Sequence, residues 1–450
     1  MSQAIPDYSP DFLTEQGIRF VRIVWCDNAN VIRAKAIHVD ALNRESQNGV
    51  GLSAAQQAVP VMMDAPVPGG GLGPVGEVWL VPDWSTLAVL PYAPGHARVM
   101  GMMQHQGNPW PWCPRQFLQR MVQATAVFGL TVQAAFESEF YLLKPGEAGP
   151  IPADNTLFSA TASMDQHYAV INAIADALVA QNIAVEQYYP ESGPGQQELS
   201  IRYGPAMQAA DQHIAFRETV RAVARQHGLI ASFVPKLFEH IAGSGCHLHL
   251  SLWRDDHNLM FNDDPGKAGQ LSDQASAFVA GILRHLPALM AITTPIPNSY
   301  RRIQPHCWSG AFRTWGYDNR EAAVRVPSSL NGPSPNQIEL KTVDNAANPY
   351  LALGCVIAAG LDGLKHRLRL ESPVNIDPGS ISDAERSQRG INPLPNDLKD
   401  AIAHLRQNTL LTRALGKSLT QTFLAVRQAE WEAMHDLSLE AEVKLLLERY

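Results

Sequence analysis

The segment AAFESEFYLL, residues 134–143, carries two acidic side chains in an otherwise apolar stretch. The apolar residues predict a buried strand, and side chains alternate between the two faces of a strand. Glu137 and Glu139 therefore share one face, while Phe136, Ser138 and Phe140 share the other. Two carboxylates side by side in an apolar strand repel each other and are costly to desolvate unless protons, bases or metal ions lie between them. An exposed edge strand would carry such a pair harmlessly, so that alternative stays open.

The composition is that of a compact soluble protein. The chain has 450 residues, enough for two or three domains, with 46% hydrophobic and 17% charged residues. The net charge of −8 and a pI near 6.0 argue against a nucleic-acid-binding surface.

Five cysteines are scattered along the chain, at positions 26, 113, 246, 307 and 355. Their odd number and wide spacing fit neither a disulfide framework nor a zinc site, which indicates a reducing compartment. The first residues lack a basic region followed by an apolar run, so no signal peptide is expected, and no apolar stretch is expected to reach membrane-spanning length. We expect a cytoplasmic protein that binds neither nucleic acid nor membrane.

The order of strand, helix and turn signals predicts two domains, residues 1–107 and 108–450, with prolines and polar residues at 104–112 marking the boundary. Residues 18–38 alternate like a hairpin with a turn at 27–30. The glycine-rich segment 65–86 is expected to be a mobile loop, because it lacks a phosphate-binding motif and leads into a strand. In the second domain we expect helices near 114–128, 165–182, 206–227, 270–291, 349–367 and through most of 396–450, and strands near 183–189, 197–203, 230–235, 245–253, 320–326 and 337–342.

Two further segments bring chemically active side chains together. In PESGPGQQELSIRY, residues 190–203, Glu191 and Glu198 flank a tight Ser-Gly-Pro-Gly turn, so both carboxylates can face one cavity. In GSGCHLHLSLW, residues 243–253, the alternation of a strand puts His247, His249 and Ser251 on one face. A single histidine is more often a core residue than a ligand, and that reading stays open here.

A third segment and a set of arginines complete the constellation. NQIELKTVD, residues 336–344, places Glu339 and Lys341 on one face of a strand. Basic side chains come from NSYRRIQPH and YDNREAAVRVP, although arginines are also common on solvated surfaces; they are Arg301, Arg302, Arg320 and Arg325.

These residue types indicate phosphoryl transfer. Carboxylates and a histidine suit hard divalent ions such as Mg²⁺ or Mn²⁺. Two such ions can neutralise charge on a transferring phosphate, and arginines bind phosphates and carboxylates. The sequence therefore predicts a metal-dependent enzyme that moves phosphate from a nucleotide to an acidic substrate.

The chain resembles the glutamine synthetase family in a series of motifs that run in order: F-E-S-E-F, E-S-G-P-G-Q-Q-E, F-V-P-K, G-S-G-C-H-L-H-L-S, N-S-Y-R-R, N-R-E-A-A-V-R-V-P, I-E-L-K and A-N-P-Y-L. The resemblance implies an α+β fold, with an N-terminal β-grasp domain and a catalytic domain built on an antiparallel sheet or half-barrel flanked by helices. It also implies a homo-oligomeric ring of ten or twelve subunits with active sites between neighbours.

The resemblance also implies roles for the residues. One metal ion would be held by Glu139, Glu191 and Glu198, and a second by Glu137, His247 and Glu339. ATP would lie along His249 and Ser251, with Tyr203 against the adenine and Arg325 on the phosphates. Gly243 and Arg302 would hold glutamate, Lys341 would help to bind the substrates, and Arg320 would stabilise the transferring phosphoryl group. ATP would convert the γ-carboxylate into an acyl phosphate, which an amine then displaces.

Several positions depart from the family pattern. Residues 50–57 contain no acid where glutamine synthetases carry an ammonium-binding aspartate, and Trp308 stands where they carry a flap glutamate. Ala242 replaces an asparagine, Lys341 replaces an arginine, and ERSQRGINPLP, residues 385–395, has no tyrosine for adenylylation. These departures resemble the branch of γ-glutamyl-amine ligases.

We therefore expect an ATP-dependent carboxylate–amine ligase that forms a γ-glutamyl amide from glutamate and an amine. Glutamine synthesis from ammonia is the first alternative, since Asp318 or Glu321 can take over the role of the missing acid. A non-catalytic structural or regulatory member of the family is the second alternative, which the six filled metal positions disfavour.

Overall fold

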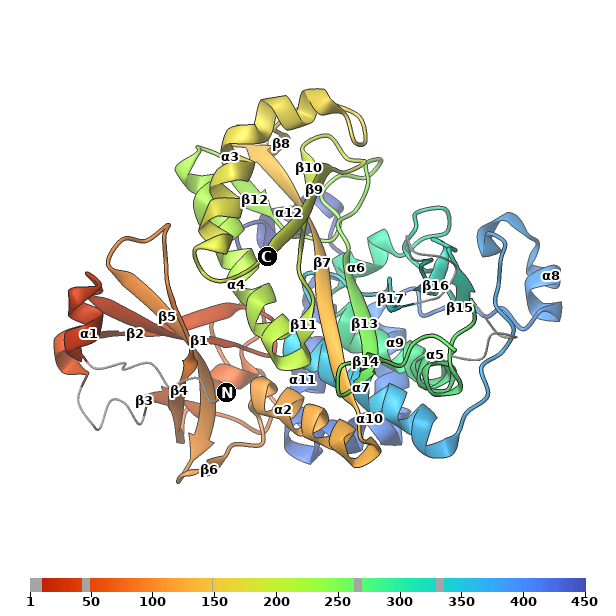
Figure 1. Cartoon of the computed structure of the whole chain (residues 1–450), viewed down its shortest axis with the longest axis horizontal. Coiled ribbons are helices and arrows are strands. Elements are labelled where there is room, and N and C mark those ends of the chain that lie inside the picture. The colour runs from red at the N-terminus through yellow and green to blue at the C-terminus, as the bar shows by residue number, and fades with distance from the viewer. Residues whose placement is uncertain (1–9, 43–48, 148, 263–268, 329–335) are drawn as a thin grey trace.

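The computed structural model describes residues 10–42, 49–147, 149–262, 269–328 and 336–450. Its N-terminal part is a six-stranded sheet with strand order β2-β1-β5-β4-β3 and with β6 paired to β5. The neighbours are antiparallel except β1 and β5, which are parallel. This sheet lies to one side of the larger catalytic part (Figure 1), and its elements are α1 (Pro10–Glu15), β1 (Phe20–Cys26), β2 (Ile32–His38), β3 (Val50–Ser53), β4 (Glu77–Val89), β5 (His96–His105) and β6 (Asn108–Pro109).

The catalytic part is built on an eleven-stranded sheet whose main order is β15-β16-β17-β13-β7-β10-β9. The long strand β7 (Thr131–Lys144) runs through its middle in Figure 1, so the Glu137 segment is not an edge strand and that alternative is wrong. The other strands are β8 (Ile151–Pro152), β9 (Val185–Pro190), β10 (Gln196–Ile201), β11 (Gly204–Pro205), β12 (Ile230–Ser232), β13 (Cys246–Arg254), β14 (His257–Asn258), β15 (Phe312–Tyr317), β16 (Ala322–Val326) and β17 (Ile338–Leu340).

Helices cover the catalytic sheet and form the end of the chain. They are α2 (Pro114–Thr125), α3 (Thr161–Val179), α4 (Ala206–Gln226), α5 (Asp273–Thr293), α6 (Pro297–Arg302), α7 (Pro349–His366), α8 (Asp383–Gln388), α9 (Leu398–Gln407), α10 (Thr409–Leu415), α11 (Lys417–Met434) and α12 (Leu439–Leu446). Helix α7 begins as the sequence predicts: the Asn348 side chain accepts hydrogen bonds from the backbone N–H groups of Tyr350 and Leu351, and Pro349 fills the first helical position.

The core helices α5 and α7 approach each other closely. A Cβ at Gly281 would lie 2.2 Å from the carbonyl oxygen of Ala359, and one at Gly363 would lie 1.9 Å from that of Ala277, so only glycine fits at either position. Among the described residues, α5 is also long and apolar enough to cross a membrane, which corrects the expectation that no stretch has that length. Since 78% of its most apolar 18-residue stretch is buried inside the protein, α5 is a core helix.

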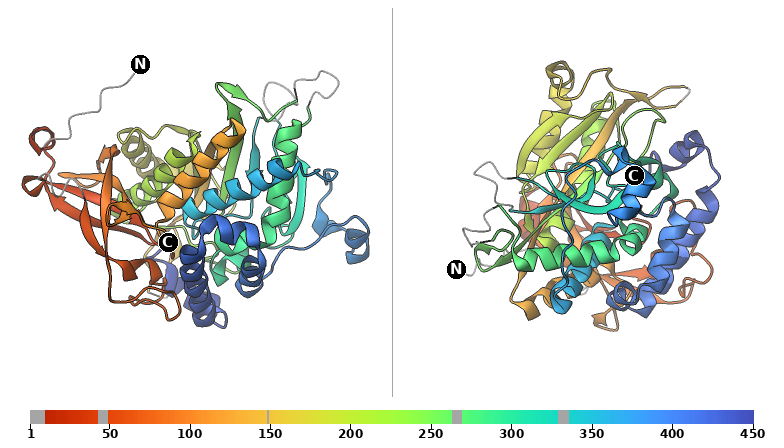
Figure 2. Two further views of the ribbon diagram at one scale, coloured as in Figure 1. Left: turned by 90° about the horizontal axis from the view of Figure 1, so that it is seen from below. Right: turned by 90° about the vertical axis from the view of Figure 1, so that its right-hand side faces the viewer.

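The turn of the β1–β2 hairpin inserts into the catalytic part instead of facing solvent. Asn30 donates a hydrogen bond to the carbonyl oxygen of Asn345 at 2.7 Å, and the Tyr450 hydroxyl donates to the carbonyl oxygen of Ala29 at 2.6 Å. The sequence predicts this turn correctly but gives no sign of its burial. The hairpin turn thereby connects the N-terminal sheet to the segment that follows β17 and to the C-terminal residue. Figure 2 shows the whole chain from two further directions. The division predicted between residues 107 and 108 falls in the β5–β6 connection and stays a prediction.

Candidate active site

The register of β7 with its two neighbours brings the first acids and the first histidine together. Glu139 on β7 lies directly opposite Glu198 on the antiparallel strand β10. Two residues earlier, Glu137 lies directly opposite His247 on β13. Side chains at opposed positions of antiparallel strands have Cβ atoms about 5 Å apart, so local pairing alone makes these contacts.

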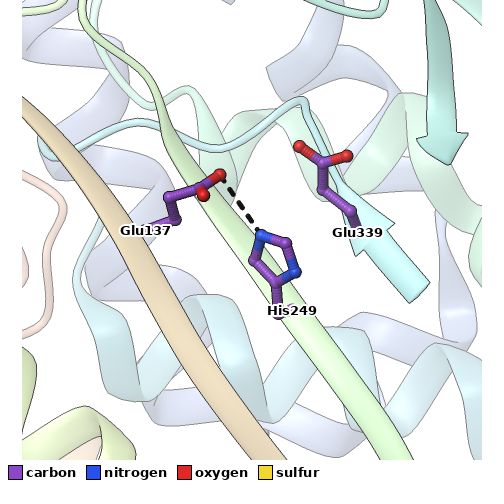
Figure 3. A group of neighbouring side chains, drawn as sticks. All are labelled: Glu137, His249 and Glu339. Atoms are coloured by element: carbon purple, nitrogen blue, oxygen red, sulfur yellow. Dashed lines mark hydrogen bonds and ion pairs between the residues drawn. The ribbon is translucent and has the colours of Figure 1, made fainter. Parts of the chain in front are cut away.

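The same row continues across the next two strands. His249 on β13 lies opposite Glu339 on β17, and Glu339 lies opposite Arg325 on β16. Figure 3 shows Glu137, His249 and Glu339 converging from three different strands. Five adjacent strands, β10, β7, β13, β17 and β16, thus present one continuous line of acids, imidazoles and an arginine.

The first acidic cluster consists of Glu139, Glu191 and Glu198, each offering a carboxylate oxygen within 4.8 Å of the others. Burial and the neighbouring Glu191 raise the pKa of Glu139 to about 8. Burial and the neighbouring Glu137 raise the pKa of Glu198 to about 11. Such shifts are the physical cost of gathering buried carboxylates without a cation, and a divalent ion removes that cost.

The second cluster contains Glu137, His249 and Glu339, with ligand atoms again within 4.8 Å of one another. Nε2 of His249 lies 3.3 Å from a Glu137 oxygen. The resemblance assigned His247 to this cluster instead. Nδ1 of His247 lies 3.2 Å from oxygens of both Glu137 and Glu339, while its Nε2 lies 3.9 Å from Glu139. His247 therefore sits between the clusters, the geometry offers His249 as a second histidine ligand, and the assignment of His247 stays a prediction.

Fixed positive charges surround Glu339. Lys341 Nζ lies 2.7 Å from one Glu339 oxygen and Arg325 Nη1 lies 3.0 Å from the other, and the Glu339 and Lys341 side chains are each only 2% exposed. Although burial opposes ionisation, Lys341 and the nearby histidines hold the pKa of Glu339 at about 2. Burial and Lys341 lower the pKa of His247 to about 4, which leaves the neutral imidazole that a metal ligand requires.

Both clusters line one cavity of about 1020 Å³. Of the predicted substrate-binding residues, Gly243, His249, Arg302, Arg320, Arg325 and Lys341 also line it. The donor set of buried carboxylate oxygens and imidazole nitrogens fits Mg²⁺ or Mn²⁺, because these hard ions prefer oxygen ligands.

Gly243 and Arg302 are packed against each other in the wall of the cavity. A Cβ at Gly243 would lie 2.6 Å from Cγ of Arg302 and 2.6 Å from the carbonyl oxygen of Pro235. One Arg302 nitrogen donates to the carbonyl oxygen of Val343 at 2.9 Å, whereas Nε is buried and has no partner among the described residues. The guanidinium is therefore held in place with donor capacity left for a ligand.

Two predicted nucleotide-binding residues lie outside the cavity lining. The Tyr203 ring stacks on Trp253 with a centroid separation of 6.5 Å and an interplanar angle of 24°. Trp253 Nε1 in turn donates to the Ser251 hydroxyl at 2.8 Å. Tyr203, Trp253 and Ser251 form a connected group, and their role toward adenine stays a prediction.

Sequence reasoning missed Gln196, which is buried next to the first cluster. Its side-chain nitrogen donates to Glu139 and to the carbonyl oxygen of Gly243, both at 3.0 Å. Gln196 thus links Glu139, a residue of the first cluster, to the backbone of Gly243 at the cavity wall. Gln196 lies between Glu191 and Glu198 in the E-S-G-P-G-Q-Q-E motif, and that position could have marked it as a site residue.

Trp308, which the resemblance places at the position of the flap glutamate, is 53% exposed and lines the cavity. Its backbone lies in the left-handed region with φ of 52°, and its N–H donates to Glu321 at 2.9 Å. The Arg320 guanidinium carbon lies 5.3 Å from the centroid of the Trp308 ring, a cation–π contact.

Asp318 and Glu321, the two acids that could take over the role of the missing ammonium-binding acid, have other partners. Glu321 accepts hydrogen bonds from the backbone N–H groups of His306 and Trp308, and Asp318 accepts one from the N–H of Ser328. Neither acid lines the cavity of the two clusters. Both stabilise loop backbone instead.

Comparison with known proteins gives a consistent answer over nearly the whole chain. The family model described as glutamine synthetase, catalytic domain, matches residues 111–446, and that of the glutamine synthetase N-terminal domain matches residues 11–110. The chain is 38% identical to γ-glutamylpolyamine synthetase GlnA3 of Streptomyces coelicolor, covering 93% of this chain and 91% of that protein. It is 32% identical to type-1 glutamine synthetase 1 of Dictyostelium discoideum, covering 96% and 90%.

Solved structures agree with this result. A crystal structure described as a novel glutamine synthase homolog has a TM-score of 0.85, 31% identity and full coverage of both chains. The GmaS/ADP complex has a TM-score of 0.84, 30% identity and coverage of 98% of this chain and 99% of that one.

The fold and the row of paired acids thus define a ligase of two-domain α+β architecture, which confirms the predicted fold class. The chain belongs to the glutamine synthetase family, and it is an ATP-dependent glutamate–amine ligase of that family, with ammonia counted among the amines.

Proposed function

We propose that the enzyme joins glutamate to an organic amine in preference to ammonia. The observation that carries this proposal is Trp308, an exposed aromatic side chain at the cavity where an acid would bind ammonium. Ammonium needs a carboxylate to attract it and to take its proton, whereas an amine with carbon attached also gains from an apolar wall. The engagement of Asp318 and Glu321 in backbone hydrogen bonds supports the proposal.

In this scheme the residues of the cavity orient the reactants and balance their charge. The first cluster (Glu139, Glu191 and Glu198) and the second (Glu137, His249 and Glu339) would each hold one Mg²⁺ or Mn²⁺ ion, which would neutralise phosphate charge during transfer from ATP. Arg302 and the Gly243 wall bind glutamate, and Arg320 and Arg325 face the transferring phosphate. The γ-carboxylate oxygen forms a bond to phosphorus, the bond to ADP breaks, and γ-glutamyl phosphate results.

The second step completes the amide. The free amine nitrogen attacks the acyl carbon, the carbon–oxygen bond to phosphate breaks, and the nitrogen loses a proton. Glu191 and Glu198 are among the carboxylates that line this cavity, and in this scheme they accept that proton.

The test is glutamate- and ATP-dependent phosphate release with ammonium and with a panel of alkyl- and arylamines. We expect a higher kcat/KM for at least one organic amine than for ammonium. Trp308→Glu should shift the preference toward ammonium, whereas Trp308→Phe, which keeps an aromatic wall and adds no charge, should not. Efficient use of ammonium with no organic amine doing better would instead assign glutamine synthesis to this enzyme.

We propose further that the protein is cytoplasmic and forms a homo-oligomeric ring of ten or twelve subunits. Membership of the glutamine synthetase family and the reduced state expected of its five cysteines support these two points. Light scattering that finds a monomer under active conditions would disprove the ring.

A further inference from the structure

Among the described residues, six glutamates line the active-site cavity, and five of them belong to the two acidic clusters. The sixth is Glu239, whose side chain is 80% exposed and therefore lies at the open side of the cavity. Its carboxylate is 3.9 Å from Nε2 of the adjacent His240, which is longer than a hydrogen bond. Glu239 thus offers a negative charge at the rim that neither cluster uses.

Two large aromatic side chains line the same cavity and are half exposed, Phe158 at 52% and Trp308 at 53%. The Phe158 loop is held in place: Ser159 adopts a left-handed backbone with φ of 55°, and its N–H donates to the carbonyl oxygen of Pro190 at 3.0 Å. Left-handed backbone is unfavourable for residues other than glycine, so the fold maintains this loop at a cost. The loop presents Phe158 to the cavity, where an apolar ligand would cover it.

The aromatic wall reaches from the rim to the metal-binding acids. The Phe158 ring contacts the edge of Tyr189, with centroids 6.0 Å apart and planes at 77°. The Tyr189 hydroxyl donates a hydrogen bond to the Glu198 carboxylate. An apolar chain lying along this wall would have one end at the first cluster and the other end near the open side.

The cations of the cavity rim have partners of their own. Lys236 Nζ donates to the carbonyl oxygen of Ile241 at 2.6 Å, and Arg320 stacks on Trp308. Both repel a second cation placed beside them. Among the described residues, Glu239 is the glutamate of this cavity that belongs to neither cluster, so it is the carboxylate left there for an additional positive charge.

Resting on the proposed function, we propose that the amine substrate is a linear diamine or polyamine, and that Glu239 binds its distal ammonium. The methylene chain packs against the half-exposed rings of Phe158 and Trp308. The proximal nitrogen reacts as the free amine, while the distal nitrogen keeps its proton and charge. Glu239 is then a specificity-determining residue that touches the substrate but not the reacting atoms.

The experiment compares α,ω-diamines of three to six carbons with n-alkylamines of the same carbon number, in glutamate- and ATP-dependent phosphate release. An exposed ion pair contributes a factor of up to about five. We therefore expect, at one chain length or more, a diamine kcat/KM about three to five times that of the matched alkylamine, through a lower KM. Glu239→Gln should bring this ratio to about one.

Two further variants complete the design. Glu186→Gln changes an exposed glutamate on β9 that pairs with Arg202 and does not line the cavity, and it should keep the diamine advantage. Phe158→Ala should raise KM for diamines and alkylamines alike, because both lose the apolar wall.

The outcomes separate this inference from the function on which it rests. If organic amines are used but no diamine outperforms its alkylamine at any length, or if the advantage persists in Glu239→Gln, the role of Glu239 is disproved while the proposed function stands. If ammonium is the better substrate throughout, the proposed function itself fails.

Discussion

Binding of a divalent ion to the first acidic cluster should release protons. The raised pKa values of Glu139, about 8, and Glu198, about 11, keep both carboxyl groups protonated at pH 7 in the metal-free protein. At that pH about nine-tenths of Glu139 and nearly all of Glu198 carry a proton. A metal ligand must be deprotonated, so binding of one Mg²⁺ at pH 7 should release between one and two protons.

The sign and size of the pH dependence follow. Near pH 9 about nine-tenths of Glu139 is already ionised, so the number of released protons should fall by nearly one between pH 7 and pH 9. Each released proton makes the affinity for Mg²⁺ rise about tenfold per pH unit. The apparent affinity should therefore increase between tenfold and a hundredfold from pH 7 to pH 8.

Isothermal titration calorimetry with Mg²⁺, without nucleotide, measures this count when it is repeated in two buffers of different ionisation enthalpy. Glu186→Gln, remote from the cluster, serves as the control and should leave the count unchanged. A release of no protons at pH 7, or a count that does not change up to pH 9, would refute the reasoning.

Four further substitutions test the site and the stability of the fold. Glu139→Ala and Glu339→Ala should each abolish turnover in the phosphate-release assay, because each removes a charged group of one cluster; near-normal activity of both at ordinary Mg²⁺ would disprove the site assignment. Asp154→Asn should lower the free energy of unfolding in urea by about 1–3 kcal/mol at pH 7, since this buried carboxylate accepts several hydrogen bonds. Although burial opposes ionisation, those bonds hold the pKa of Asp154 at about 2. The stability that the ionised carboxylate contributes is therefore complete above about pH 4 and is lost as the pH falls toward 2. An equal loss of unfolding free energy in Asp154→Asn at pH 2 and at pH 7 would contradict this. Gly243→Ala should raise the KM for glutamate, because the new methyl group displaces Arg302, and an unchanged KM would show that the wall adapts.

Part of the site could be predicted from the sequence, because it depends on residues that are close together in the chain. The alternation of a strand is a property of two neighbouring residues, so it places Glu137 with Glu139 and His247 with His249 whatever the rest of the chain does. The start of α7 at Pro349 was predicted correctly, and its cap by the adjacent Asn348 is equally local. The grouping of Glu139, Glu191 and Glu198, which rested on resemblance, is also the grouping that the structure brings together.

Other features depend on contacts between residues far apart in the chain, which no local pattern encodes. Strand β15 was not predicted, and it forms by pairing with β16. The burial of the β1–β2 turn depends on Asn345 and Tyr450, more than 300 residues away.

The amine end of the cavity shows the same limit. The resemblance seen in the sequence implied that Trp308 replaces an acid, but it left Asp318 and Glu321 as substitutes for that acid. Only the tertiary structure assigned both to the loop backbone and brought Phe158 and Glu239 to the same cavity. The physical reason is that the sequence specifies which groups can donate, accept or carry charge, whereas packing and strand register decide which of them meet.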